Sequence, residues 1–101
     1  MSYRVIVLPA VESQILDQAL FIAEDSIDRA IDWEQALREH ILSLGDLPKA
    51  CPISEPESRA FGRDIRKTNF GDYLLFYRVD DEHQSVYLLT FMHGAQRKDC
   101  D

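Results

Sequence analysis

The chain begins with a short apolar run and then changes to a helical repeat. Residues 3–8 are apolar and rich in β-branched side chains, and Pro9 follows them, which predicts a first strand. Over about residues 10–24, one stripe of apolar residues recurs at helical spacing while polar residues occupy the opposite side. This pattern predicts a first helix, whose stripe consists of Val11, Ile15, Ala19 and Ile22.

A second helical repeat follows a break near Asp25. Ser26 can cap its N-terminus, because a serine oxygen accepts a hydrogen bond from the first free backbone amides of a helix. Gly45 and Pro48 mark its end, since glycine commonly terminates a helix and proline prevents its continuation. Its apolar positions are Ala30, Trp33, Leu37, Ile41 and Leu44. With so short a break, the two helices are predicted to form an antiparallel hairpin with one common apolar side.

The chain loses its helical pattern after Pro48. Residues 49–58 contain two prolines and two serines, which predicts a loop. Residues 61–68 are a weak and basic strand candidate, and residues 69–72 are typical of a turn.

The last part of the chain predicts a β-hairpin. Residues 73–79 and 86–92 are strongly strand-forming, and the polar residues 80–83 form a turn between them. The order β-α-α-β-β-β therefore predicts a single α+β domain over residues 1–101. In this fold the helical hairpin packs on one face of a mainly antiparallel four-stranded sheet.

Both faces of the predicted β-hairpin are apolar. Counting with a period of two groups Leu88 with Thr90 and Met92 on one face of the second strand. A layer of two helices covers only one face of a sheet, so the other face is predicted to expose an aromatic patch to a partner. Alternatively, the loop of residues 45–60 folds over this patch.

Composition and charge narrow the function. Of the 101 residues, 46% are hydrophobic and 29% charged, which is ordinary for one globular domain and argues against disorder or membrane spanning. A net charge of −7 argues against a general nucleic-acid binder. The whole excess of acids lies in residues 1–57, whereas residues 59–67 carry four cations and one acid. A local basic strip therefore lies on an acidic body.

The cysteines and the N-terminal residues indicate where in the cell the protein is expected and whether it binds a metal. Cys51 and Cys100 form neither a disulfide framework nor a zinc-binding spacing, so reduced thiols in the cytoplasm are expected. The N-terminal apolar run is too short for a signal peptide or a membrane span. The sequence has no glycine-rich phosphate loop and no metal-binding motif, so we expect no metal and no cofactor.

Three short motifs give the sequence a family resemblance. They are residues 22–26 (Ile-Ala-Glu-Asp-Ser) leading to Ala36-Leu37, residues 77–82 (Tyr-Arg-Val-Asp-Asp-Glu), and His93-Gly94 followed by Arg97. Together with the β-α-α-β-β-β order, they resemble the RelE/ParE superfamily of bacterial toxins. The ending is similar to that of the ParE-like branch, also called plasmid stabilisation proteins. The resemblance covers nearly the whole chain.

The resemblance implies a toxin of a type II toxin-antitoxin system, silenced by an antitoxin that wraps a C-terminal segment across it. An antitoxin laid along the sheet would cover the predicted apolar face. We therefore expect the antitoxin to contact the predicted hairpin, at Tyr73, Leu75, Tyr77 and Leu88. The same face would also allow a homodimer.

Members of the superfamily follow one of two chemistries. RelE-like members cut messenger RNA on the ribosome, and ParE-like members bind and block DNA gyrase. RNA cleavage by a 2′-hydroxyl needs a base, cations near the phosphate and an acid, and the candidates are His93, Arg78 and Lys67. RelE-like nucleases carry an arginine right after the first aromatic residue of the third strand, where this chain has Leu74. The C-terminal tyrosine of some members is also missing.

These departures and the acidic body favour an inhibitor of gyrase, because ribosomal phosphate repels a protein of this charge. The alternatives are a RelE-like nuclease and a toxin-fold binding module without toxicity. The expected target contacts are Arg63, Arg66, Lys67, His93 and Arg97. Plainer roles compete with these. Arg78 can pair with the nearby acids, His93 can pack or cap a turn, and the basic strip can solubilise an edge strand.

Overall fold

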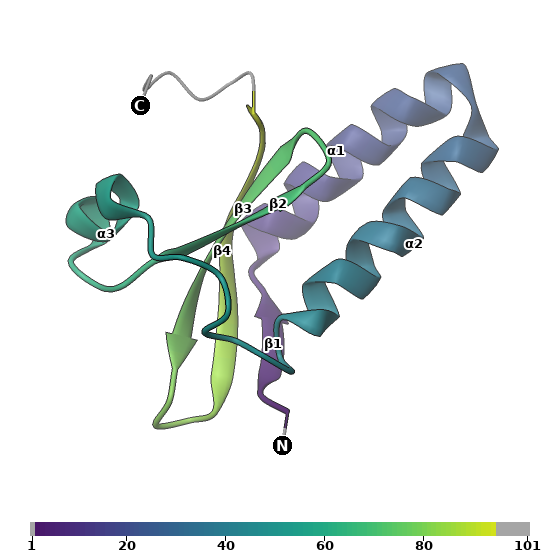
Figure 1. Cartoon of the computed structure of the whole chain (residues 1–101). Helices are drawn as coiled ribbons and strands as arrows, with labels where there is room; N and C mark the ends of the chain where they lie inside the picture. The colour runs from purple at the N-terminus through teal and green to yellow at the C-terminus, as the bar shows by residue number, and fades with distance from the viewer. Residues whose placement is uncertain (1, 95–101) are drawn as a thin grey trace.

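The computed structural model describes residues 2–94 of the chain, and Figure 1 shows how they are arranged. In chain order the elements are β1 (Arg4–Val7), α1 (Pro9–Asp25), α2 (Ile27–Ser43), α3 (Glu55–Phe61), β2 (Arg66–Phe70), β3 (Tyr73–Asp80) and β4 (Ser85–His93). Arg97 and Cys100 lie outside the described residues. None of the described helices has the length and apolar character needed to cross a membrane. The predicted α+β class is confirmed.

The four strands form one sheet in the order β1-β4-β3-β2. The last three strands make the predicted antiparallel meander, whereas β1 pairs in parallel with β4, with Val5 opposite Val86. Two parallel neighbours need a long crossover, which α1 and α2 contribute to. Figure 1 shows both helices on one side of the sheet and α3 on the other.

Local signals explain the helical hairpin. Pro9 takes the first helical position of α1, where a missing amide hydrogen is harmless. Ser26 separates the helices, and its side chain accepts a hydrogen bond from the Arg29 amide at 3.2 Å, which confirms the predicted cap. Arg38 of α2 then joins the helices by donating to both carboxylate oxygens of Glu12, at 2.9 and 2.7 Å. These hydrogen bonds lower the pKa of Glu12.

A register shift between β3 and β4 decides which side chains face the helices. Tyr77 lies opposite Leu88, but its neighbour Phe76 lies opposite Thr90. Leu89 therefore has no partner and forms a β-bulge, in which one extra residue reverses the alternation of the strand.

The core lies between the two long helices and one face of the sheet. It consists of Val11, Ile15, Leu37, Ile41, Leu44, Leu75, Tyr77, Val86, Leu88 and Phe91. Because of the bulge, Phe91 shares the inner face with Leu88, and its neighbours Thr90 and Met92 do not join the core. The period-two prediction, which grouped Thr90 and Met92 with Leu88, is wrong beyond that residue.

The outer face of the sheet does not expose the predicted aromatic patch. Phe76 on this face is only 2% exposed, and the Arg78 guanidinium lies 5.0 Å from the ring centre of Tyr87. The strongly exposed large apolar residues in the described chain lie elsewhere: Leu16, Leu20, Phe21, Ile27, Ile31, Leu42, Leu47, Ile53 and Phe61. The predicted partner surface on the sheet is therefore wrong, and most of the exposed apolar area is on α1 and α2.

A short third helix replaces part of the predicted loop and strand. α3 has Pro56 in its first turn and ends at Gly62, whose φ of 69° is left-handed. Ser58 holds this helix to the chain before β2, because its Oγ accepts a hydrogen bond from the Ile65 amide at 2.8 Å. β2 consequently starts at Arg66, later than predicted, and continues through Phe70 into the predicted turn.

The φ of Gly45 is not positive, so its backbone conformation does not itself require glycine. Glycine is needed here because two backbone segments approach each other closely. Its carbonyl accepts a hydrogen bond from the Tyr3 amide at 2.8 Å. A Cβ at this position would overlap the carbonyl oxygen of Tyr3 and lie 3.1 Å from Cγ2 of Val5. The end of α2 is thus clamped against the start of β1.

We expect Gly45→Ala to lower the free energy of unfolding by about 1–3 kcal/mol, because the added methyl group must push two backbone segments apart. Urea denaturation followed by circular dichroism measures this loss. Gln35→Ala, an exposed change on α2, is the control and should shift the free energy by less than about 0.5 kcal/mol. Equal stability of the two variants would contradict the clamp.

His40 gives the fold a pH dependence. Its Nε2 lies 3.1 Å from Thr68 Oγ1, its ring centre lies 5.5 Å from that of Phe70, and burial lowers the pKa of His40. A lowered pKa means that the folded state binds fewer protons. Its stabilisation is therefore present above pH about 6.5 and is lost as the pH falls through the lowered value. Between about pH 7 and 5, unfolding free energies should fall more steeply for the wild type than for His40→Gln. Parallel curves in urea titrations would refute this role.

Candidate functional site

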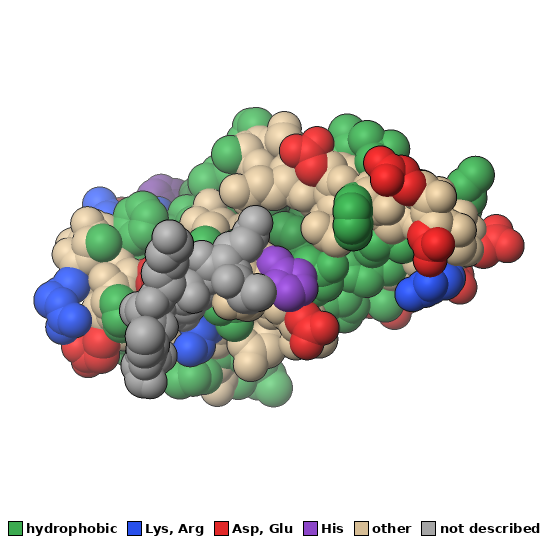
Figure 2. All heavy atoms as spheres, turned by 90° about the horizontal axis from the view of Figure 1, so that it is seen from above, with side chains coloured by type: hydrophobic (Ala, Val, Ile, Leu, Met, Phe, Trp, Pro, Cys, Tyr) green, Lys and Arg blue, Asp and Glu red, His purple; other side chains and the backbone are tan. Residues whose placement is uncertain are grey.

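A groove lies between the tip of the helical hairpin and one end of the sheet. Three hollows, of about 490, 510 and 460 Å³, share Phe21 of α1 as a wall. Their other apolar and aromatic walls come from α1, α2, β3 and β4, and are Ile22, Trp33, Tyr73, Phe91 and Met92. Figure 2 shows hydrophobic side chains gathered in this hollow. We name this site the hairpin groove.

Aromatic rings build the floor of the hairpin groove. Tyr73 stacks on Phe91 with ring centres 5.1 Å apart, and Trp33 packs at 5.4 Å from Tyr73 and 6.0 Å from Phe91. His93 meets the Tyr73 ring edge-on at 5.1 Å. Burial, and to a lesser degree the charge of Asp72, raises the pKa of Tyr73, so its hydroxyl stays neutral. The floor is a preformed aromatic surface suited to an apolar side chain.

Charged side chains of α1 and α2 form the rim. Arg29 pairs with Asp25 at 3.2 Å, so this couple largely cancels. The other rim acids are Asp17, Glu24 and Asp32, which have no ion-pair partner among the described residues. Residues 9–43 as a whole carry two cations and eight acids, a net charge of −6. The hairpin groove is therefore an apolar surface in acidic surroundings.

The residues predicted to bind an antitoxin lie on the inner face of the sheet. Leu75, Tyr77 and Leu88 are fully buried under the helices, so another polypeptide cannot reach them in this structure. This part of the prediction is corrected. Tyr73 is only partly buried and lines the hairpin groove. Sequence reasoning missed Phe21, although a large aromatic residue off the buried stripe of a helix indicates an exposed apolar contact.

The predicted catalytic residues lie on opposite faces of the sheet. His93 is the register partner of Tyr73 and packs on its ring, on the helix side. Lys67 lies opposite Phe76 on the other face, which Arg78 shares because it is two residues further along β3. A histidine on one side of a sheet cannot exchange a proton with a phosphate held on the other side. These three residues do not form one site.

The predicted target-binding cations divide by role. Arg66 donates to the carbonyl oxygens of Cys51 at 2.6 Å and Lys49 at 3.2 Å, so it holds the segment after α2 against β2. Arg63 is exposed just after α3, and Lys67 is partly exposed on the outer face. Neither has an ion-pair partner among the residues that the structure describes. Of the predicted arginines and lysines that the structure describes, Arg63 and Lys67 remain available to a target.

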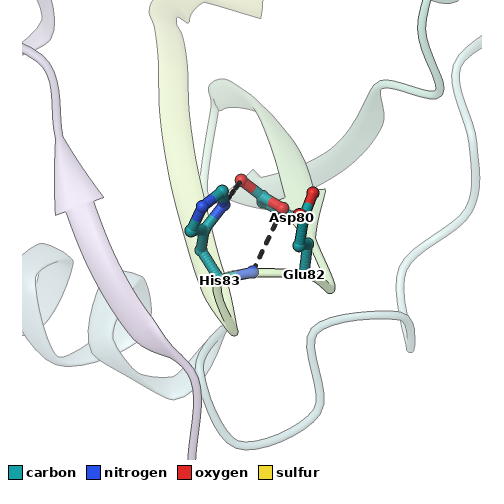
Figure 3. A group of neighbouring side chains, drawn as sticks. All are labelled: Asp80, Glu82 and His83. Atoms are coloured by element: carbon teal, nitrogen blue, oxygen red, sulfur yellow. Dashed lines mark hydrogen bonds and ion pairs between the residues drawn. The ribbon is translucent and has the colours of Figure 1, made fainter.

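The turn between β3 and β4 gathers Asp80, Glu82 and His83, as Figure 3 shows. His83 Nδ1 lies 2.8 Å from one Asp80 oxygen, and the His83 amide donates to the other at 3.3 Å. This contact lowers the pKa of Asp80. Arg78 lies 3.8 Å from the same carboxylate, as the sequence allowed. The ligand atoms of the three turn residues are close enough for a metal ion, but Asp80 is already engaged in fastening the turn.

Comparison with known proteins adds to this geometry. The family model described as the ParE toxin of type II toxin-antitoxin system, parDE, matches residues 5–98. The crystal structure of the toxin-antitoxin complex RelBE2 from Mycobacterium tuberculosis contains a chain of the same fold. It is 21% identical, with a TM-score of 0.66 over 92% of this chain and 99% of that chain. No curated protein matches the chain.

The position of Arg66 predicts a role in stability. Arg66→Ala removes two hydrogen bonds from a charged donor and should lower the free energy of unfolding by about 1–3 kcal/mol. Arg63→Ala is the matched control, because its exposed side chain has no ion pair among the described residues, and it should leave stability unchanged. Thermal and urea unfolding of both variants measures the difference. If the two variants unfold alike, Arg66 does not hold the segment after α2.

Proposed function

Because the chain belongs to the ParE toxin family of type II toxin-antitoxin systems, we propose that it binds and inhibits DNA gyrase and is silenced by a cognate antitoxin. The observation that carries the choice of target is the separation of His93 from Lys67 and Arg78 by the sheet. An RNA-cleaving enzyme needs its base, its acid and its cations around one phosphate. This chain lacks that constellation among its described residues.

The charge distribution supports the same choice. The helical hairpin carries nearly all of the net charge of the chain, −6 of −7. A field of this sign slows the approach to dense RNA phosphate, whereas a protein target imposes no such barrier. Leu74 also lies on the outer face of the sheet, and its apolar side chain cannot bind the phosphate of an RNA substrate.

Arg63 and Lys67 are the proposed contacts with gyrase. Both follow α3 in the chain, and neither side chain has an ion-pair partner among the described residues. Arg66, between them, is already engaged by backbone carbonyls. An interface charge that is not needed for folding can act on the rate of association and on specificity.

The hairpin groove is the proposed seat of the antitoxin. It combines an aromatic floor, in which Trp33 and Tyr73 are partly exposed, with Phe21, which is 66% exposed. Large apolar side chains in such a position favour a protein partner. Lys67 lies on the outer face of the sheet opposite Phe76, whereas Tyr73 and Phe91 of the groove floor lie on the helix side, so antitoxin and target would contact different faces.

The test is activity of the purified chain, freed of any antitoxin, on two substrates. We expect inhibition of gyrase-catalysed DNA supercoiling and no cleavage of ribosome-bound messenger RNA. Arg63→Ala and Lys67→Ala should each raise the concentration for half-inhibition several-fold, because each removes a charge from the interface. Arg4→Ala, which removes an exposed cation from β1, is the control and should inhibit like the wild type.

Two outcomes would overturn the proposal. Cleavage of ribosome-bound messenger RNA that His93→Ala abolishes would assign the chain to the nucleases. If the chain shows neither activity and its expression leaves growth normal, it would be a binding module with a toxin fold.

A further inference from the structure

The charge on the rim of the hairpin groove favours one kind of partner over others. Three carboxylates on its rim, those of Asp17, Glu24 and Asp32, lack an ion-pair partner among the described residues. Among the described residues that line the groove, Arg29 is the one Lys or Arg, and it already pairs with Asp25 at 3.2 Å. A partner that enters the groove must therefore bring its own positive charge or leave these carboxylates uncompensated.

We propose that the groove receives a cationic, amphipathic segment of the antitoxin, in which apolar residues are flanked by Lys or Arg. This rests on the proposed function, since the antitoxin is the partner. The apolar residues pack between Phe21 and the stacked rings of Tyr73 and Phe91. The flanking cations lie near the rim acids.

The charge of the groove disfavours three other occupants. A second copy of this chain would add another net charge of −7 next to a hairpin that carries −6, so the groove does not fit self-association. An acidic segment meets the same repulsion. A nucleic acid would approach with its phosphates toward unpaired carboxylates.

The experiment uses a candidate antitoxin, sought as the product of a gene that neighbours the gene of this chain, co-produces it with the chain and measures the dissociation constant of the complex. Asp32→Lys should weaken binding by about tenfold or more, because it turns an attraction into a repulsion. Glu39→Lys is the matched control: it makes the same charge change at an exposed position of α2 that does not line the groove. It should change the constant by less than about twofold.

The apolar part is tested in the same assay. Phe21→Ser should weaken binding by about tenfold or more, as removal of a central aromatic anchor does. Leu42→Ser is the control, because Leu42 is equally exposed, at 66%, on α2 but outside the groove. Circular dichroism checks that all four variants remain folded.

The outcomes separate this inference from the proposed function. Equal effects of Asp32→Lys and Glu39→Lys, or a groove-binding segment with net negative charge, would overturn the cationic segment while the toxin assignment stands. Failure of the neighbouring gene product to bind the wild-type chain at all would count against the proposed function itself. Rescue of Asp32→Lys by a Lys→Glu change in the antitoxin segment would support the pairing directly.

Discussion

The unpaired residue Leu89 is the constraint on which the rest of the structure depends. In the part of β4 before Leu89, the even-numbered side chains face the helices. In the part after Leu89, the odd-numbered side chains do. This switch brings Phe91 into the core and puts His93 beside Tyr73, on the helix side of the sheet. The same switch builds the aromatic floor of the hairpin groove and removes His93 from the face that carries Lys67 and Arg78.

The sequence predicted those elements whose stabilising interactions are local. The two long helices, the Ser26 cap and the three strands of the meander follow from periodicity and turn residues. The bulge was not predictable, because a strand with apolar residues on both faces gives no sign of where its alternation reverses. α3 was missed because seven residues that begin with Glu-Pro have too few turns for a helical period to stand out. Period-two counting grouped Leu75 with Tyr77 on one face correctly, but both faces of the predicted hairpin are apolar, so it could not tell which face the helices cover.

Net charge is distributed unevenly over the molecule. Residues 9–43, which contain α1 and α2, carry two cations and eight acids, while the exposed or partly exposed cations Arg63 and Lys67 follow α3. Surface charge of this kind contributes little to stability, because solvent screens it and because separate like charges repel each other. In the proposed function this division serves recognition, with one surface for an antitoxin and another for a target. The aromatic groove would then supply contact area, and the surrounding carboxylates would select which peptide can use it.

The outer edge of β2 is covered by another segment of the chain, residues 52–54. Ile53 bridges to Arg66, the Lys67 amide donates to the Pro52 carbonyl at 3.0 Å, and the Ser54 amide donates to the Ile65 carbonyl at 2.7 Å. The opposite edge is β1, which has only four residues and ends two residues before Pro9. Exposed strand edges are the templates on which cross-β stacking and amyloid growth begin. Because one edge of this sheet is covered and the other is short, little strand edge is open to pairing with another molecule.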